Sequence, residues 1–207
     1  MLEQASTSDE TQEEKPMAEV LLFHHAQGLT PGVLALAEEL RSGGHTVHAP
    51  DLYAGRTFSS LDDGVAHAKE LGFDAIAEQG VRVADELPAG LVYAGISLGV
   101  LPAQKLAQTR PGARGALLMA AAFGPSEFGT GWPAEVSVQV HGKDADPEFA
   151  NEWDLPAARA LVEGARAGEL FLYPGEEHLF MDRSLDQHDA AATELLVQRM
   201  LAFLEGR

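Results

Sequence analysis

The chain of 207 residues contains no cysteine. Disulfide bonds, thiolate catalysis and zinc sites with cysteine ligands are therefore excluded. Basic residues are also scarce, because 14 Lys and Arg stand against 32 Asp and Glu, for a net charge of −18. Binding to nucleic acid or to an anionic membrane surface requires clustered basic side chains, so we expect neither partner. No apolar run is long enough to span a bilayer.

The N-terminal residues 1–17 are mostly polar and acidic. They lack the basic and apolar regions of a signal peptide, so we expect a disordered acidic tail on a cytoplasmic protein. The remaining residues, 18–207, are expected to form one domain, because a chain of this length with 45% hydrophobic residues can bury a single core. The sequence leaves the oligomeric state open.

Short apolar runs alternate with helical patterns from residue 19 onward. The runs that predict strands are 20–24, 46–49, 91–95, 116–120, 136–140 and 170–173. Helices are predicted over 33–41, in two parts of 61–87, from 100 onward, over 157–167 and over 190–204. Apolar strands separated by helices indicate an α/β fold with a mainly parallel sheet and helices on both faces. In such folds, functional groups gather at the carboxyl ends of the strands.

The segment Gly95-Ile96-Ser97-Leu98-Gly99 lies where a predicted strand turns into a predicted helix. A Gly-x-Ser-x-Gly motif in this setting is typical of the nucleophile elbow of α/β hydrolases. Its glycines are needed because a Cβ would collide with a neighbouring strand or helix. Ser97 is therefore the candidate nucleophile, and the Leu98 N–H a candidate oxyanion donor. Pro102, about one turn into the helix, is unexpected because it has no N–H.

A serine nucleophile needs a base, usually a histidine that a carboxylate orients. His178 is the candidate base, because a Pro-Gly turn after the last predicted strand places it on a loop above the sheet. Asp144 and Asp146 both follow the fifth predicted strand, and either could be the acid. We favour Asp146, since the proline after it holds an extended backbone. Asp154 is expected instead to cap a helix.

The loop after the first predicted strand, residues 24–32, is expected to supply the second oxyanion donor, for which the Ala26 N–H is the candidate. The adjacent His24 and His25 suggest a metal site. However, neighbouring strand residues point to opposite faces, and no His-Glu-x-x-His spacing is present. We therefore expect no metal and no other cofactor. His25 is kept as an auxiliary candidate, either as an oxyanion donor or as a second base.

The chain resembles the dienelactone hydrolase family of α/β hydrolases over nearly its whole length after residue 18. The resemblance rests on the loop 24–30, the run Pro50-Asp51-Leu52-Tyr53, the elbow at Ser97, and Tyr173-Pro174-Gly175 leading to His178 and Phe180. It implies a small α/β hydrolase without a cap domain and with a nucleophile–Asp–His triad.

The chain departs from the best-known members of this family, which open an unsaturated lactone carboxylate with a cysteine nucleophile. Ser97 stands at the nucleophile position, and His25 replaces the first-loop glutamate that helps to control the thiol. The arginines that bind the substrate carboxylate are not evident, because Arg56 and Arg183 are more readily interpreted as solvated surface charges.

The sequence thus predicts a serine hydrolase that cleaves a small ester or lactone through an acyl-enzyme, with Ser97, His178 and Asp146 as the triad. The alternative is a non-catalytic binding or regulatory protein that retains the hydrolase fold.

Overall fold

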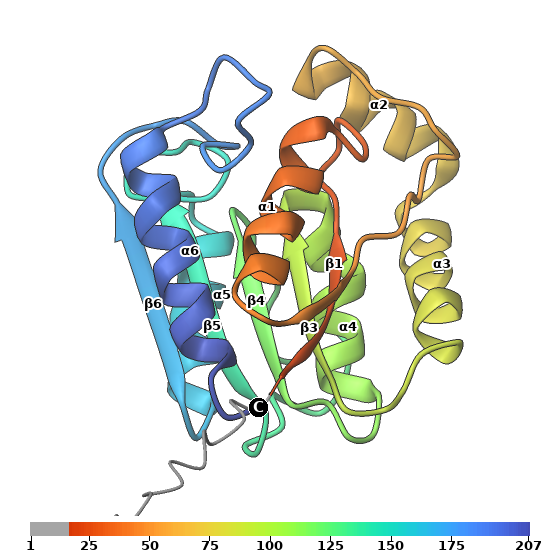
Figure 1. Ribbon diagram of the computed structural model, residues 1–207, viewed down its shortest axis with the longest axis vertical. Helices are drawn as coiled ribbons and strands as arrows, with labels where there is room; N and C mark the ends of the chain where they lie inside the picture. The colour runs from red at the N-terminus through yellow and green to blue at the C-terminus, as the bar shows by residue number, and fades with distance from the viewer. Residues whose placement is uncertain (1–16) are drawn as a thin grey trace, which may run out of the picture.

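The computed structural model describes residues 17–207 (Figure 1), so the predicted tail lies outside the described residues except for Met17. The strands are β1 (Glu19–Phe23), β2 (Thr46–His48), β3 (Leu91–Ile96), β4 (Gly115–Met119), β5 (Ser137–Lys143) and β6 (Gly168–Tyr173). The helices are α1 (Pro31–Ser42), α2 (Leu61–Leu71), α3 (Phe73–Asp85), α4 (Val100–Thr109), α5 (Asp154–Gly164) and α6 (Ala190–Leu204), with a 3-10 turn at Ser97–Gly99. The predicted alternation of strands and helices is confirmed.

The strands form one sheet in the order β2-β1-β3-β4-β5-β6, and every neighbouring pair is parallel. The chain moves outward from β1 to β2 and then returns across β1 to β3. The strand order therefore reverses between β1 and β3. Ligands of open α/β sheets bind at the carboxyl ends of the strands at such a reversal.

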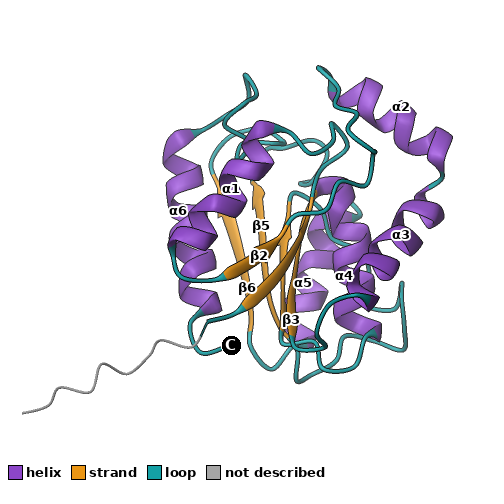
Figure 2. Cartoon of the chain, turned by 45° about the vertical axis from the view of Figure 1, so that its right-hand side comes forward, coloured by secondary structure: helices purple, strands orange, loops and turns teal. Residues whose placement is uncertain are grey.

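Helices cover both faces of the sheet, as predicted, while α2 lies beyond its carboxyl end (Figures 1 and 2). Helices α1 and α6 pack on one face, where Leu36 and Met200 join a core with Val20 and Leu22 of β1. Helices α3, α4 and α5 pack on the other face, and their apolar residues form a second core. Both faces of the strands are thus buried, which explains why the strands are continuously apolar.

Two local details concern residues that the sequence singled out, Pro102 and Asp154. Pro102 is the third residue of α4, where an N–H would have no partner within the helix, so the proline is tolerated without a break. Asp154 does not cap α5, because it is the first residue of that helix. The Asn151 Oδ1 atom instead accepts the N–H groups of Trp153 and Asp154, at 2.7 and 2.8 Å. None of the helices in residues 17–207 has the length and apolar character needed to cross a bilayer.

The buried His141 of β5 makes stability depend on pH. Burial lowers the pKa of His141 to about 3, whereas an unfolded histidine titrates near pH 6.5. As the pH falls from about 6.5 towards about 3, His141 binds a proton in the unfolded chain but stays neutral in the folded chain, so the stability of the folded state decreases. Between pH 7 and pH 4.5 both proteins lose unfolding free energy. We expect this loss to be about 2 to 3 kcal/mol smaller in His141→Gln than in the wild-type protein. Urea titrations at both pH values measure this, and equal losses in the two proteins would contradict it.

Candidate active site

Ser97 occupies a strained turn at the carboxyl end of β3. Its φ is +49°, which is rare for a residue with a Cβ. A Cβ at Gly95 would lie 2.2 Å from the carbonyl oxygen of Gly99, and one at Gly99 would lie 2.3 Å from that of Phe23. The motif therefore needs both glycines, because backbone atoms of the turn and of β1 fill the space that side chains would take.

His178 lies between Ser97 and Asp146. Its Nε2 atom is 2.9 Å from the Ser97 Oγ atom, and its Nδ1 atom is 2.7 Å from the Asp146 Oδ2 atom. Asp146 is fully buried, and its Oδ1 atom accepts the Glu148 N–H at 2.9 Å. Since a carboxylate accepts hydrogen bonds, the Nδ1 atom carries the proton of the neutral ring, which leaves Nε2 to accept from the serine hydroxyl.

Asp144 is not brought to His178. Its side chain is exposed, and the Oδ1 atom accepts the Gly175 N–H at 3.1 Å. Asp144 therefore ties the end of β5 to the Pro174-Gly175 turn that precedes His178. Of the two aspartates that the sequence left as alternatives, Asp146 contacts His178 and Asp144 does not.

The loop that carries His178 is held by a buried amine that the sequence did not point to. Lys143 ends β5, and its side chain is 1% exposed. The Nζ atom lies 2.5 Å from Asp189 and 3.0 Å from Glu177. Burial alone would lower the pKa of Lys143, but hydrogen bonds to the two carboxylates outweigh it and raise the pKa. Lys143 therefore stays charged and fastens the residues around His178.

A cavity of about 200 Å³ opens beside the serine. Ala26 after β1 and Leu98 after Ser97 both line it, together with Ser97 and His178. Its other walls are mostly apolar and come from α2, α3 and the loop after β4; they are Val65, Ala68, Phe73, Ala120, Ala121 and Phe123. The two residues whose amides are the candidate oxyanion donors therefore border the same space as the serine and the histidine.

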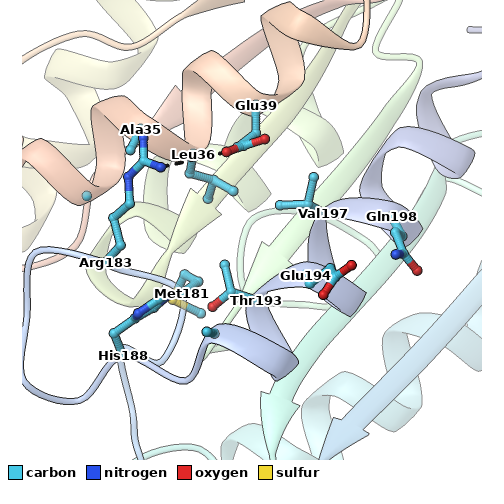
Figure 3. Close-up of a pocket in the computed structure, with 12 residues that line it drawn as sticks. Ala35, Leu36, Glu39, Met181, Arg183, His188, Thr193, Glu194, Val197 and Gln198 are labelled. Atoms are coloured by element: carbon cyan, nitrogen blue, oxygen red, sulfur yellow. Dashed lines mark ion pairs between the residues drawn. The ribbon is translucent and has the colours of Figure 1, made fainter.

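The charged groups of this cavity are carboxylates. Glu148 and Asp154 line it, and among the residues that the structure describes no Lys or Arg does so. The Asp154 Oδ1 atom accepts the Ala122 N–H at 3.0 Å and thereby supports one wall. Arg56 lies elsewhere, 5.4 Å from the ring centre of Phe58, and Arg183 pairs with a helix α1 carboxylate, as Figure 3 shows. Sequence reasoning missed Glu148, since no motif marks it, and interpreted Asp154 as a helix cap instead of a cavity residue.

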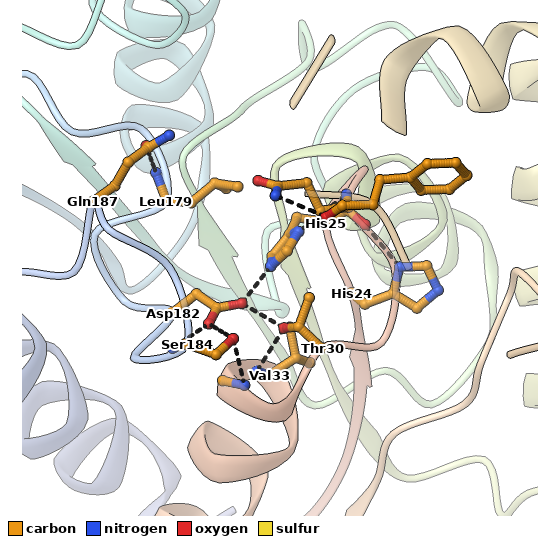
Figure 4. A network of polar contacts seen from close by, with 11 residues as sticks. His24, His25, Thr30, Val33, Leu179, Asp182, Ser184 and Gln187 are labelled. Carbon is orange, nitrogen blue, oxygen red and sulfur yellow. Dashed lines mark hydrogen bonds and ion pairs between the residues drawn. The ribbon is translucent and has the colours of Figure 1, made fainter. Parts of the chain in front are cut away.

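The side chains of His24 and His25 point apart (Figure 4). The Nε2 atom of His24 lies 3.0 Å from the Leu52 nitrogen, and its Nδ1 atom lies 2.8 Å from the carbonyl oxygen of His25. The His25 ring contacts the Asp182 carboxylate at 2.8 Å and the Gln27 N–H at 3.2 Å. Both ring nitrogens of His25 are thus engaged, and His25, the auxiliary candidate for second base or oxyanion donor, does not line the cavity beside Ser97. Within residues 17–207, no three His, Asp or Glu side chains gather to hold a metal ion.

Asp182, the partner of His25, is a second buried residue that the sequence did not point to. Burial opposes its ionisation, but hydrogen bonds from His25, Ser184 and Thr30 outweigh that effect and lower the pKa of Asp182 to about 2. Its carboxylate is therefore charged at neutral pH. The contact with His25 spans 157 positions of the chain, so no local pattern could indicate it.

Another cavity, of about 280 Å³, lies between α1, α6 and the loop before α6 (Figure 3). Its walls include Leu36, Met181 and Val197, with Arg183 and His188 at its border. Ser97 and His178 do not line it. The candidate nucleophile and the candidate base thus line the smaller cavity at the end of β3.

The six-stranded parallel sheet, the covering helices and the strained serine turn define an α/β hydrolase fold. The model of the dienelactone hydrolase family matches residues 6–206, and the chain belongs to that family. No curated protein matches the sequence.

Solved structures share the fold at low sequence identity. A dienelactone-hydrolase-like promiscuous phosphotriesterase from metagenomic libraries is 17% identical with a TM-score of 0.70, over 94% of this chain and 88% of that one. A candidate dienelactone hydrolase from Klebsiella pneumoniae is 15% identical with a TM-score of 0.68, over 94% and 89%. An esterase from Thermogutta terrifontis is 17% identical with a TM-score of 0.55, over 95% and 85%.

The elbow geometry predicts which glycines tolerate a methyl group. We expect Gly99→Ala to lower the unfolding free energy by at least about 2 kcal/mol, because its Cβ meets rigid backbone of β1. Gly129→Ala is the matched control, since no atom lies within 4 Å of its Cβ position, and we expect a change within about 0.5 kcal/mol. Denaturant unfolding of both variants measures the difference. Equal stability of the two would show that the approach of the turn to β1 is not tight.

Proposed function

We propose that the protein is a serine hydrolase that cleaves a small carboxylic ester or lactone. The observation that carries this proposal is the unbroken contact from Ser97 through His178 to Asp146, at 2.9 and 2.7 Å, beside a cavity. A hydroxyl, an imidazole and a buried carboxylate in this order are the elements of nucleophilic acyl transfer.

In the proposed reaction, the His178 Nε2 atom takes the hydroxyl proton while the Ser97 Oγ atom bonds to the substrate carbonyl carbon. The resulting imidazolium gives that proton to the leaving alkoxide as the ester bond breaks, which leaves an acyl-enzyme. A water molecule then loses a proton to His178 and attacks the acyl carbon, and the serine regains its proton as the acid departs. Asp146 holds the ring and stabilises its charged form in both halves.

The negative charge that develops on the carbonyl oxygen requires donors that are already in place. We assign this task to the backbone N–H groups of Leu98 and Ala26, because both residues line the cavity that contains Ser97. Neither assignment depends on a side chain, so replacement of Leu98 or Ala26 by another small apolar residue would leave the donors intact.

The cavity favours small substrates without negative charge. Its volume of about 200 Å³ suits a short acyl group between apolar walls. Glu148 and Asp154 would repel a substrate carboxylate, and the net charge of −18 would add to the repulsion. We therefore propose that the substrates are neutral or cationic esters and lactones, and not the lactone carboxylates that the best-known members of the family cleave.

A non-catalytic binding protein with the same fold remains the rival interpretation. It would not require the alignment of His178 with both Ser97 and Asp146, nor a strained φ at Ser97. Strain of this kind costs about 1–3 kcal/mol and is usually retained where a site uses it. These two features favour the enzyme.

Variants of the proposed triad provide the first test. We expect Ser97→Ala to abolish labelling by a fluorophosphonate probe and to lower kcat for p-nitrophenyl acetate by at least about 10³-fold. Asp146→Asn should lower kcat by about 10²- to 10⁴-fold, because the wrong histidine tautomer results. Asp144→Asn is the matched control on the same loop, and its kcat should stay within about 3-fold. Folded wild-type protein that neither labels nor hydrolyses short esters would refute the proposal.

Substrate charge provides the second test. Among acyl esters of equal length, we expect kcat/KM to be lower by about 10-fold for an ω-carboxylate than for the neutral ester. Glu148→Gln should reduce this penalty by about 3-fold, because it removes one carboxylate from the cavity wall. Glu163→Gln makes the same charge change on an exposed face of α5 and should not alter the penalty. Equal rates for neutral and anionic esters in the wild type would contradict the electrostatic account.

A further inference from the structure

The two histidines that follow β1 are held in opposite tautomers. In His24, the Nε2 atom accepts the Leu52 N–H at 3.0 Å, so the proton of the neutral ring is on Nδ1. That Nδ1–H donates to the carbonyl oxygen of His25 at 2.8 Å. Burial lowers the pKa of His24 to about 4, which keeps the ring neutral near pH 7.

The His25 ring has the reverse arrangement. Its Nδ1 atom accepts the Gln27 N–H at 3.2 Å, and its Nε2–H donates to the Asp182 Oδ2 atom at 2.8 Å. Both side chains of this second pair are completely buried. Because each ring has one donor and one acceptor partner, the two histidines hold the backbone on either side of the His25–Ala26 peptide.

These contacts set the direction of the Ala26 N–H. The carbonyl oxygen of His25 accepts two hydrogen bonds, from the His24 ring at 2.8 Å and from the Gly28 N–H at 3.0 Å. Residues 17–207 contain no cis peptide bond, and in a trans peptide the N–H points opposite to the C=O. Two donors on the oxygen therefore fix the orientation of the amide on the other side, at a residue that lines the Ser97 cavity.

Asp182 connects this loop to the segment that carries His178. Besides His25, the Asp182 carboxylate accepts hydrogen bonds from the hydroxyl groups of Thr30 and Ser184 (Figure 4). Thr30 caps α1, so the carboxylate contacts the loop both before and after Ala26. A Cβ at Gly32 would lie 1.6 Å from the Asp182 Oδ1 atom, which shows how closely the two segments approach.

We propose that His24, His25 and Asp182 are positioning residues that aim the Ala26 N–H at the oxyanion and hold it in a fixed place relative to His178. This inference rests on the proposed hydrolase function. None of the three side chains lines the cavity, so they act through the peptide and not on the substrate.

Replacements at His25 test the proposal, with p-nitrophenyl acetate as substrate. His25→Leu removes both ring contacts and should lower kcat by about 10- to 100-fold with KM within about 3-fold, because a displaced donor weakens mainly the transition state. His25→Gln keeps a side-chain N–H for Asp182 and should recover kcat to within about 5-fold of the wild type. If His25→Leu does not fold, His25→Asn, which also loses the Asp182 contact, takes its place in the comparison.

His48 provides the matched control. It lies on β2, away from the cavity, and its Nε2 atom contacts the carboxylate of Glu19 on β1 at 2.7 Å. His48→Leu and His48→Gln should keep kcat within about 2-fold. The pH dependence of kcat/KM separates positioning from general damage. We expect His25→Leu to lower the whole profile without moving its midpoint, since His25 does not contact His178, whereas a disturbed triad would move it.

A second measurement does not depend on activity. Nitrogen NMR of histidine-labelled wild-type protein should show the proton on Nδ1 of His24 and on Nε2 of His25. Reversed tautomers, or a kcat of His25→Leu within 3-fold of the wild type, would overturn the inference. Wild-type protein without any esterase activity would instead overturn the proposed function and this inference with it, and that failure is recognised because it appears before any residue is changed.

Discussion

The close backbone contact between the Ser97 turn and the end of β1 is the constraint on which the site depends. It requires glycine at position 99, where a Cβ would lie 2.3 Å from the Phe23 carbonyl oxygen. Because β1 and β3 are adjacent parallel strands, their following loops emerge side by side. The reversal of strand order at this pair leaves room for a cavity between those loops. The serine and the Ala26 amide become neighbours through this topology and not through a contact of their own side chains.

The buried histidines show how one residue type can serve different ends. His24, His25 and His141 are fully buried, and the ring nitrogens of each make hydrogen bonds to the protein. His24 and His25 each accept a backbone N–H, which can only donate, so a proton cannot be added to that nitrogen without the loss of the hydrogen bond. His141 faces the Tyr173 hydroxyl, but that pair lies away from the cavity, whereas the hydroxyl that His178 faces belongs to Ser97 and borders the cavity. The hydrogen-bond partners of each ring therefore decide whether the histidine is suited to a structural or to a chemical role.

Local patterns in the sequence were sufficient for the parallel α/β fold, the family and the serine turn, because each depends on residues close together in the chain. They also located the loop of Asp146, although the choice over Asp144 needed the geometry of His178. The contact of His25 with Asp182 spans 157 positions, and that of Lys143 with Asp189 spans 46. Pairs of this kind form only when distant loops meet at one end of the sheet. The sequence therefore kept His25 only as an auxiliary candidate, either as an oxyanion donor or as a second base, and gave no sign of its contact with Asp182.

The exchange of cysteine for serine and the exchange of glutamate for His25 have a common physical explanation. In the cysteine members that the chain resembles, an acidic group in the first loop helps to control a thiol. In the proposed reaction the serine hydroxyl transfers its proton directly to His178, so an additional acid in that loop has no task. A carboxylate at position 25 would also face the Asp182 carboxylate, and it would remove the hydrogen bond from His25 that helps to lower the pKa of Asp182. Two buried like charges at such a distance would be strongly unfavourable, whereas an imidazole N–H satisfies the carboxylate. The first loop then has no part in proton transfer, and in our proposal His25 serves instead to orient the Ala26 amide.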